Sequence, residues 1–144
     1  MRHPIHVAHA TATLDQLSGG RFIFGVGVGT SHESTLNESM NLGVPFSKRG
    51  NILNDSLDII RNLWRGETVS STGIYSFNDA RLSVPPIREP PIYVATTKFD
   101  SKSGFPTSIQ KRIEQHADGL MPQTDPSNYS SMISHARDIV EKSG

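Results

Sequence analysis

The chain has 144 residues, of which 35% are hydrophobic and 19% charged, and its formal net charge at pH 7 is zero. This length allows one domain with a sizeable core, and a neutral surface gives no electrostatic reason to expect nucleic acid or an anionic membrane as a partner. No apolar stretch approaches the roughly 18 residues of a membrane span. The absence of cysteine excludes disulfides and cysteine-ligated zinc. Because the first residues also lack the apolar core of a signal peptide, we expect a cytoplasmic protein.

The first expected element is a helix that begins at Pro4. Proline suits an opening helical turn because its missing N–H has no intrahelical partner there. Apolar residues then follow at helical spacing: Val7, Ala10, Leu14 and Leu17. Gly19 and Gly20 end the helix. Residues 21–29 form a short apolar run with three glycines, and such a run is typical of a strand buried on both faces in a parallel sheet.

Residues 30–47 show no periodicity and predict a loop or a short helix. From about Lys48 a longer helix is expected, which ends at Gly66. Its apolar stripe consists of Leu53, Leu57, Ile60 and Trp64. Residues 67–91 contain the proline pairs 85–86 and 90–91, so they cannot form one regular element, and we expect an excursion with a small hairpin.

The last part of the chain predicts two strands and two helices. Residues 92–95 (Ile-Tyr-Val-Ala) are apolar throughout and predict a second buried strand, followed by a polar loop at 97–107. A short helix is expected over Ser108–His116 and a third strand over residues 119–122. Asp125-Pro-Ser then caps a final helix.

This alternation of helices and strands predicts an α/β protein with a parallel sheet, because each strand needs a crossover before its parallel neighbour. Three parallel strands alone leave two unpaired edges, which proteins normally avoid. A closed (β/α)₈ TIM barrel removes both edges but needs eight strands and about 250 residues. We therefore expect either a fragment of a barrel or a chain that pairs with copies of itself.

Five motifs resemble, in the same order, those of the luciferase-like monooxygenase family of flavin oxidoreductases. They are Thr13–Arg21 with the following Phe24–Gly29, then Leu42–Gly50, Leu63–Gly66, Pro90–Ala95 and Ala117–Met121. The family fold is a (β/α)₈ barrel, and the motifs resemble its fourth to sixth strands. The resemblance implies that residues 1–144 are a single partial barrel domain with about three parallel strands and flanking helices.

The same resemblance implies an oxidoreductase that uses FMN or the deazaflavin coenzyme F-420 and acts on a small organic substrate by hydride transfer or oxygenation. Two alternatives stay open. In the first, the chain is a truncated, non-catalytic barrel fragment with weak or no cofactor binding. In the second, it is a half-barrel that forms a homodimer. No nucleic acid or membrane partner is expected.

Cofactor-binding residues are expected where strands end, because active sites of (β/α)₈ enzymes lie at the carboxyl ends of the strands. The resemblance places Val28, Gly29 and Thr30 against the flavin or deazaflavin ring. A dinucleotide fingerprint is a poor description of these glycines, since the third glycine of G-x-G-x-x-G is missing. At the end of the next strand, the resemblance places Ala95, Thr96 and Thr97 near the cofactor phosphate. An ordinary capping role for the two threonines is the alternative.

Catalytic candidates are few. His32 and Glu33 follow the glycine loop and have side chains suited to general acid or base catalysis. Gln123, after the third strand, is a further candidate for contact with the ring or the substrate. Arg49 matches the family, although a helix-start contact or an ion pair also explains it, and Trp64 is expected in the core.

No metal site is expected. His3, His6 and His9 recur every three residues, which spreads them around a helix. Asp118 and Gly119 lie at the amino end of the third strand, opposite the expected site, where a turn role is favoured.

Overall fold

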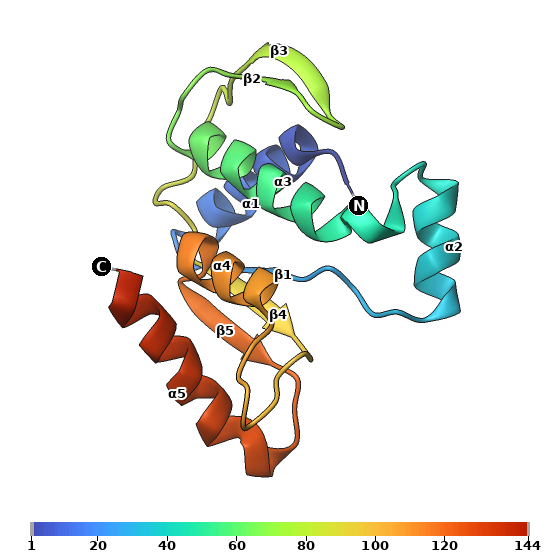
Figure 1. Cartoon of the computed structure of the whole chain (residues 1–144). Helices are drawn as coiled ribbons and strands as arrows, with labels where there is room; N and C mark the ends of the chain where they lie inside the picture. Colours follow the sequence, from blue (N-terminus) through green and yellow to red (C-terminus); the bar gives the residue numbers. More distant parts are fainter. Residues whose placement is uncertain (1, 144) are drawn as a thin grey trace. The chain divides into compact units, whose positions relative to one another are not determined.

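The computed structural model describes residues 2–143, and their contacts group into two compact units (Figure 1). The first unit comprises residues 2–22 and 28–90, and the second comprises residues 23–27 and 91–143. The expectation of a single domain stays a prediction. Within the described residues, no helix combines the length and the apolar character needed to cross a membrane.

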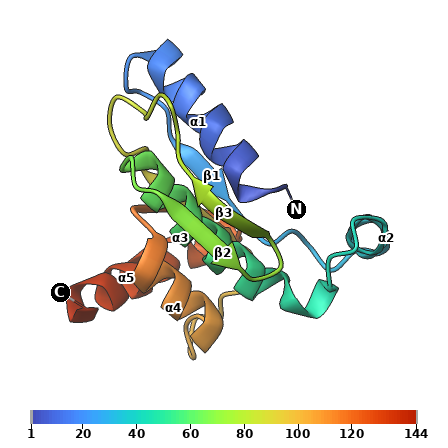
Figure 2. The ribbon, with the colours of Figure 1, turned by 90° about the horizontal axis from the view of Figure 1, so that it is seen from above.

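The first unit is built on two long helices, α1 (Pro4–Ser18) and α3 (Arg49–Trp64), which pack against each other. It also contains α2 (Glu33–Asn41), the short 3₁₀ helix η1 (Phe46–Lys48), and a hairpin of β2 (Val69–Thr72) and β3 (Ser76–Ala80). The hairpin lies beside α3 (Figure 2). The expected small hairpin is thus confirmed, and the segment at 30–47 contains a helix of nine residues.

Helix α1 begins and ends as its sequence predicts. The His3 imidazole Nδ1 accepts a hydrogen bond from the Ile5 backbone N–H at 3.3 Å, directly before Pro4. At the other end Gly19 adopts the left-handed conformation at φ 65°, and the Gly20 N–H donates to the Asp15 carbonyl at 2.9 Å. A glycine in this conformation closes a helix without steric strain.

The inward face of α1 differs from the expected apolar stripe. Leu14 and Leu17 are 48% and 80% exposed, whereas Ala8, Ala12 and Asp15 are buried. The reason is the partner helix: α3 contributes large apolar side chains, so small residues on α1 let the two helices approach closely. The stripe expected on α3 is confirmed, since Leu53, Leu57, Ile60 and Trp64 are all buried.

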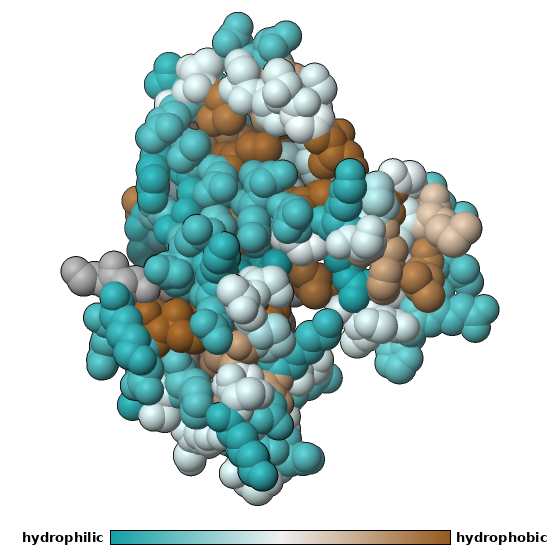
Figure 3. All heavy atoms as spheres, viewed as in Figure 1, coloured by the Kyte–Doolittle hydropathy of each residue, from teal (hydrophilic) through white to brown (hydrophobic). Residues whose placement is uncertain are grey.

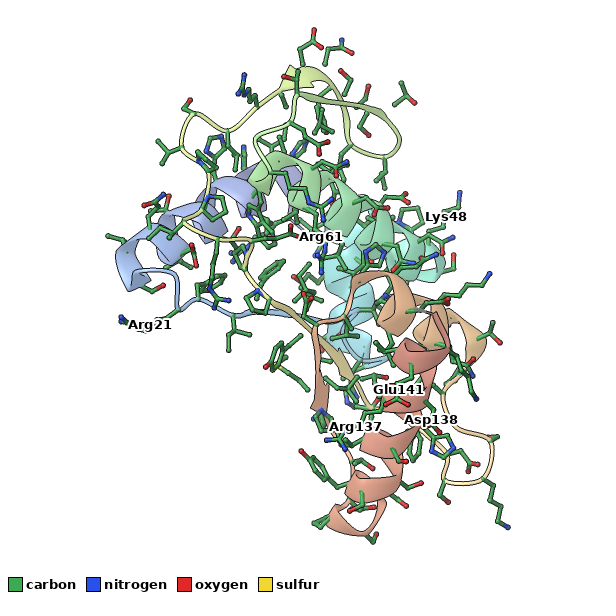
Figure 4. All side chains as sticks on the ribbon, turned by 90° about the vertical axis from the view of Figure 1, so that its left-hand side faces the viewer. Arg21, Lys48, Arg61, Arg137, Asp138 and Glu141 are labelled. Atoms are coloured by element: carbon green, nitrogen blue, oxygen red, sulfur yellow. The ribbon has the colours of Figure 1, made fainter. Side chains whose placement is uncertain are left out.

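The buried Asp15 carboxylate fixes the segment that leads to the next strand. Its Oδ2 accepts hydrogen bonds from the backbone N–H groups of Ile87 at 2.9 Å and Arg88 at 3.3 Å. Glu89 in the same segment pairs with two arginines of α3 and its end, Arg61 and Arg65 (Figure 4 labels Arg61). The proline-rich segment before β4 is therefore held in place by the carboxylates of Asp15 and Glu89.

The second unit is a three-stranded sheet with two helices. Its strands β1 (Phe24–Val26), β4 (Ile92–Thr96) and β5 (Gly119–Pro122) pair in parallel in the order β1-β4-β5. Helices α4 (Thr107–His116) and α5 (Pro126–Ser143) pack against each other and on β4 and β5, respectively. Three parallel strands with flanking helices confirm the expected α/β class.

The strands of this sheet are buried on one face only. Ile92 and Val94 on the central strand are fully buried, while the alternating Tyr93 and Ala95 are partly exposed. The expectation of strands buried on both faces was therefore wrong for the described residues, because α4 and α5 cover one side of the sheet. On the other side, a Cβ atom at Gly119 would lie 2.6 Å from the Tyr93 ring, so this ring packs directly on the glycine.

We expect Asp15→Ala to lower the free energy of unfolding by about 1–3 kcal/mol, because the Ile87 and Arg88 N–H groups would lose a buried acceptor. Asp15→Asn keeps one acceptor oxygen and should cost less. Thermal and urea unfolding would measure both. Leu17→Ala is the matched control on the same helix and should change stability by under about 0.5 kcal/mol. The reverse ranking would show that the apolar stripe, and not Asp15, faces inward.

Candidate active site

The carboxyl edge of the parallel sheet brings together Gly27, Ala95 and Met121. Ala95 and Met121 are register partners on β4 and β5, and a Cβ atom at Gly27 would lie 3.3 Å from the Ala95 Cβ. These positions lie on the face that α4 and α5 leave uncovered. Gly27 and Ala95 are small and leave the backbone beside them accessible, as a planar ring lying against the strand ends would require. Gly27 thus shares this edge with Ala95.

Thr96 and Thr97 differ in their surroundings. Thr96 is 8% exposed, its Oγ1 accepts a hydrogen bond from the Lys98 N–H at 3.1 Å, and its carbonyl accepts from the Gln123 N–H at 3.2 Å. The capping role is therefore present in Thr96, although its hydroxyl proton can still be donated. Thr97 is exposed at the same edge. Gln123 is tied to β4 through its backbone, and its side chain is exposed.

Val28, Gly29 and Thr30 belong to the first unit and form a loop before α2. Gly29 has φ 74°, and a Cβ atom there would also lie 3.3 Å from Cγ2 of Thr35. The Thr30 and Thr35 hydroxyl oxygens are 3.4 Å apart. A left-handed residue without a Cβ atom is what this turn requires. The loop conformation therefore depends on glycine at position 29.

His32 and Glu33 stand at the start of α2 with exposed side chains. His32 occupies the N-cap position without a side-chain cap hydrogen bond. Beyond them, α2 and its end present apolar side chains to the surface, namely Leu36, Met40 and Leu42 (Figure 3, right). The candidate acid–base groups therefore adjoin an exposed apolar surface, and their catalytic role stays a prediction.

The sequence predicted a site at the end of the third strand, residues 121–123, but assigned the contact to Gln123 and no role to the exposed Met121. A Cβ atom at Gly25 would lie 2.8 Å from the Met121 Cε, so this side chain reaches across β4 onto β1. Met121 is 41% exposed. This contact pairs a glycine on one strand with a long, flexible side chain two strands away. It can be recognised in the sequence only when the register of the strands is known.

Of the three histidines near the N-terminus, His3 is held by packing, while His6 and His9 are exposed. The His3 ring caps α1 and lies 4.9 Å from Tyr75 and 5.7 Å from Phe77 between ring centroids. Across residues 2–143 no cluster of histidine and carboxylate side chains has the arrangement of a metal site. Tyr75, which packs against His3, is half-buried, and this burial raises the pKa of its hydroxyl.

The loop after β4 is a compact turn. Asp100 and Gly104 exchange backbone hydrogen bonds of 3.1 and 2.8 Å. The Asp100 carboxylate accepts hydrogen bonds from the backbone and hydroxyl of Ser103 and from the Lys102 N–H, and these bonds hold its pKa below the usual range. Phe99 and Phe105 anchor the turn next to His135 of α5. The hydrogen bonds of this turn hold the backbone shortly after Thr97 in one conformation.

Comparison with known proteins identifies the family. The model of the luciferase-like monooxygenase family matches residues 1–144. The F420-dependent glucose-6-phosphate dehydrogenase of Amycolatopsis mediterranei (strain U-32) is 34% identical over 131 residues, and the match covers 83% of this chain and 38% of that protein.

Two solved structures resemble this chain in fold. The monooxygenase RslO1 from Streptomyces bottropensis superimposes with a TM-score of 0.75 at 23% identity, covering 99% of this chain and 42% of its own. An F420-dependent secondary alcohol dehydrogenase, solved with an F420-acetone adduct, gives a TM-score of 0.69 at 25% identity, covering 94% and 41%. The chain thus spans about two-fifths of the length of these proteins, and its sheet and helices are part of a (β/α)₈ barrel.

We expect the turn at residues 100–104 to stay closed throughout the neutral range. A carboxyl group whose pKa is lowered by folding stabilises the folded state above its unfolded pKa of about 3.9, and this contribution disappears as pH falls through the lower folded value. Asp100→Ala should therefore speed amide exchange at Lys102 and Ser103 at pH 7, while Ser101→Ala should not. An NMR titration that gives Asp100 an ordinary or raised pKa would contradict the assignment.

Proposed function

We propose that this chain, which belongs to the luciferase-like monooxygenase family, is part of an oxidoreductase that transfers a hydride between a small hydroxyl-bearing substrate and coenzyme F-420. Support for this cofactor and reaction comes from two compared proteins. One is named as an F420-dependent glucose-6-phosphate dehydrogenase and the other as an F420-dependent secondary alcohol dehydrogenase. Both names describe the oxidation of a carbon that carries a hydroxyl group. FMN is the alternative cofactor in this proposal.

The observation that carries the proposal is the open edge at Gly27 and Ala95. Gly27 is exposed, and a Cβ atom there would crowd the Ala95 Cβ at 3.3 Å, so this strand end presents bare backbone. An accessible backbone of this kind suits the flat ring of a deazaflavin. The bound coenzyme would supply the hydride chemistry, while the protein holds the ring and excludes water.

In this proposal, the other candidate residues divide into three roles. Val28, Gly29 and Thr30 contact the ring, since the left-handed Gly29 leaves the loop backbone exposed. Ala95, Thr96 and Thr97 lie near the phosphate, where the exposed Thr97 hydroxyl and the Thr96 hydroxyl proton are the donors. When the carbon that bears a substrate hydroxyl loses a hydride, the hydroxyl oxygen must lose its proton, and His32 and Glu33 are the candidate proton acceptors.

A fluorescence titration of the purified chain with coenzyme F-420, and separately with FMN, tests the proposal. We expect saturable micromolar binding of coenzyme F-420 and weaker binding of FMN. Gly27→Val should weaken binding by about tenfold or more, because its side chain would occupy the ring's position. Gly73→Ala, in the exposed hairpin turn, is the matched control.

Binding of neither cofactor by a folded sample would contradict the proposal and support the non-catalytic fragment. Tighter binding of FMN would retain the family and replace the hydride chemistry with oxygenation. Size-exclusion chromatography of the same sample would show whether binding accompanies formation of a homodimer.

A further inference from the structure

Arg49 opens helix α3, and its guanidinium group reaches the loop at residues 28–31. Nη1 donates to the Thr30 carbonyl oxygen at 3.1 Å, and Nη2 makes a longer contact of 3.5 Å with the Ser31 hydroxyl. The guanidinium carbon also lies 3.6 Å from the centroid of the Phe46 ring in η1. The stacked ring holds the plane of the group, so its N–H groups point in a fixed direction.

The 28–31 loop has few other side-chain anchors. Its residues lie in no helix or strand, and Gly29 takes a left-handed conformation at φ 74°. Within residues 2–143, the side chains that hydrogen-bond to this loop come from Arg49 and from Thr35, whose hydroxyl lies 3.4 Å from that of Thr30. The conformation of the loop therefore depends strongly on Arg49.

The charge of Arg49 is not used in an ion pair. Across residues 2–143 Arg49 has no carboxylate partner, whereas Arg61 and Arg65 both pair with Glu89. Arg49 donates instead to a neutral carbonyl oxygen, and a hydrogen bond from a charged donor is stronger than one from a neutral donor. The ion-pair explanation expected as an alternative from the sequence is therefore wrong for this residue.

We infer that Arg49 is a positioning residue, which holds the 28–31 loop in the conformation that receives the cofactor ring. This inference rests on the proposed function, because the ring is proposed to contact Val28, Gly29 and Thr30. Arg49 itself touches the Thr30 carbonyl on the loop and need not touch the cofactor. Its effect on binding comes from reducing the number of conformations that the free loop samples.

Arg49→Ala and Arg49→Lys test the inference, with Lys48→Ala as the matched control. Lys48 is the exposed cation one position earlier (labelled in Figure 4). Hydrogen–deuterium exchange is the first readout, since it needs no cofactor. We expect Arg49→Ala to speed exchange at residues 28–35 by about tenfold, the loss for one charged-donor hydrogen bond. Lysine keeps the charge but not the planar stacked group, so it should restore only part of the protection.

Cofactor affinity is the second readout. We expect Arg49→Ala to weaken binding of coenzyme F-420 by about tenfold, with Arg49→Lys in between and Lys48→Ala unchanged. Guanidinium chloride at low millimolar concentration should restore part of the affinity of Arg49→Ala, because the ion can occupy the vacated place on the Phe46 ring. Sodium chloride at equal ionic strength should not. A merely destabilised protein would show no such rescue.

The two readouts separate the possible failures. If the unaltered chain binds no cofactor while Arg49→Ala still loosens residues 28–35, the proposed function fails and the contact between Arg49 and the loop stands. If the chain binds coenzyme F-420 and Arg49→Ala binds it equally well, the positioning role is wrong. If circular dichroism shows that Arg49→Ala is unfolded, Arg49→Lys becomes the deciding variant. Unchanged hydrogen–deuterium exchange and unchanged cofactor affinity in Arg49→Lys would then overturn the inference.

Discussion

The register of the central strand β4 determines which side chains stand at the candidate site. Its amino end is fixed on both sides: the Phe24 N–H donates to the Pro91 carbonyl at 2.9 Å, and Ile92 exchanges two 2.8 Å hydrogen bonds with Asp118, one through the Asp118 side chain. A slip of one residue would move every side chain of the strand to the opposite face. Asp118 therefore influences the site from the far end of the sheet, in the turn role that its position in the sequence favoured.

The elements themselves were predictable because their ends carry local signals. Pro4, the left-handed Gly19 and Gly66 mark helix ends through backbone properties that no distant contact alters. Which face of α1 packs inward was not predictable in this way. It follows from the large apolar residues of α3, which accept alanines and exclude Leu14 and Leu17. Helix packing of this kind is a property of two segments, and the pattern of one segment does not contain it.

The candidate site was outlined from the sequence by the strand-end rule and by the family resemblance. Ala95 and Thr96 lie where the rule for parallel strands places them, at the carboxyl edge of β4. The contacts of Gly27 and Met121 were not predictable, because they depend on a close approach between neighbouring strands and on a side chain that crosses the sheet. The contact between Arg49 and Thr30 was also beyond the sequence, since 19 residues separate the partners and no periodicity connects them.

The packing of the Tyr93 ring on Gly119 has a consequence for how this sheet can vary. A Cβ atom at position 119 would meet ring carbons at 2.6–2.8 Å, so the two positions share one volume. Enlarging residue 119 requires a smaller residue at 93, and the effects of changing the two are not additive. In related sequences or in design, residues 93 and 119 should therefore change size together, and a variant that keeps tyrosine at 93 and adds a side chain at 119 would have to move the ring off the sheet.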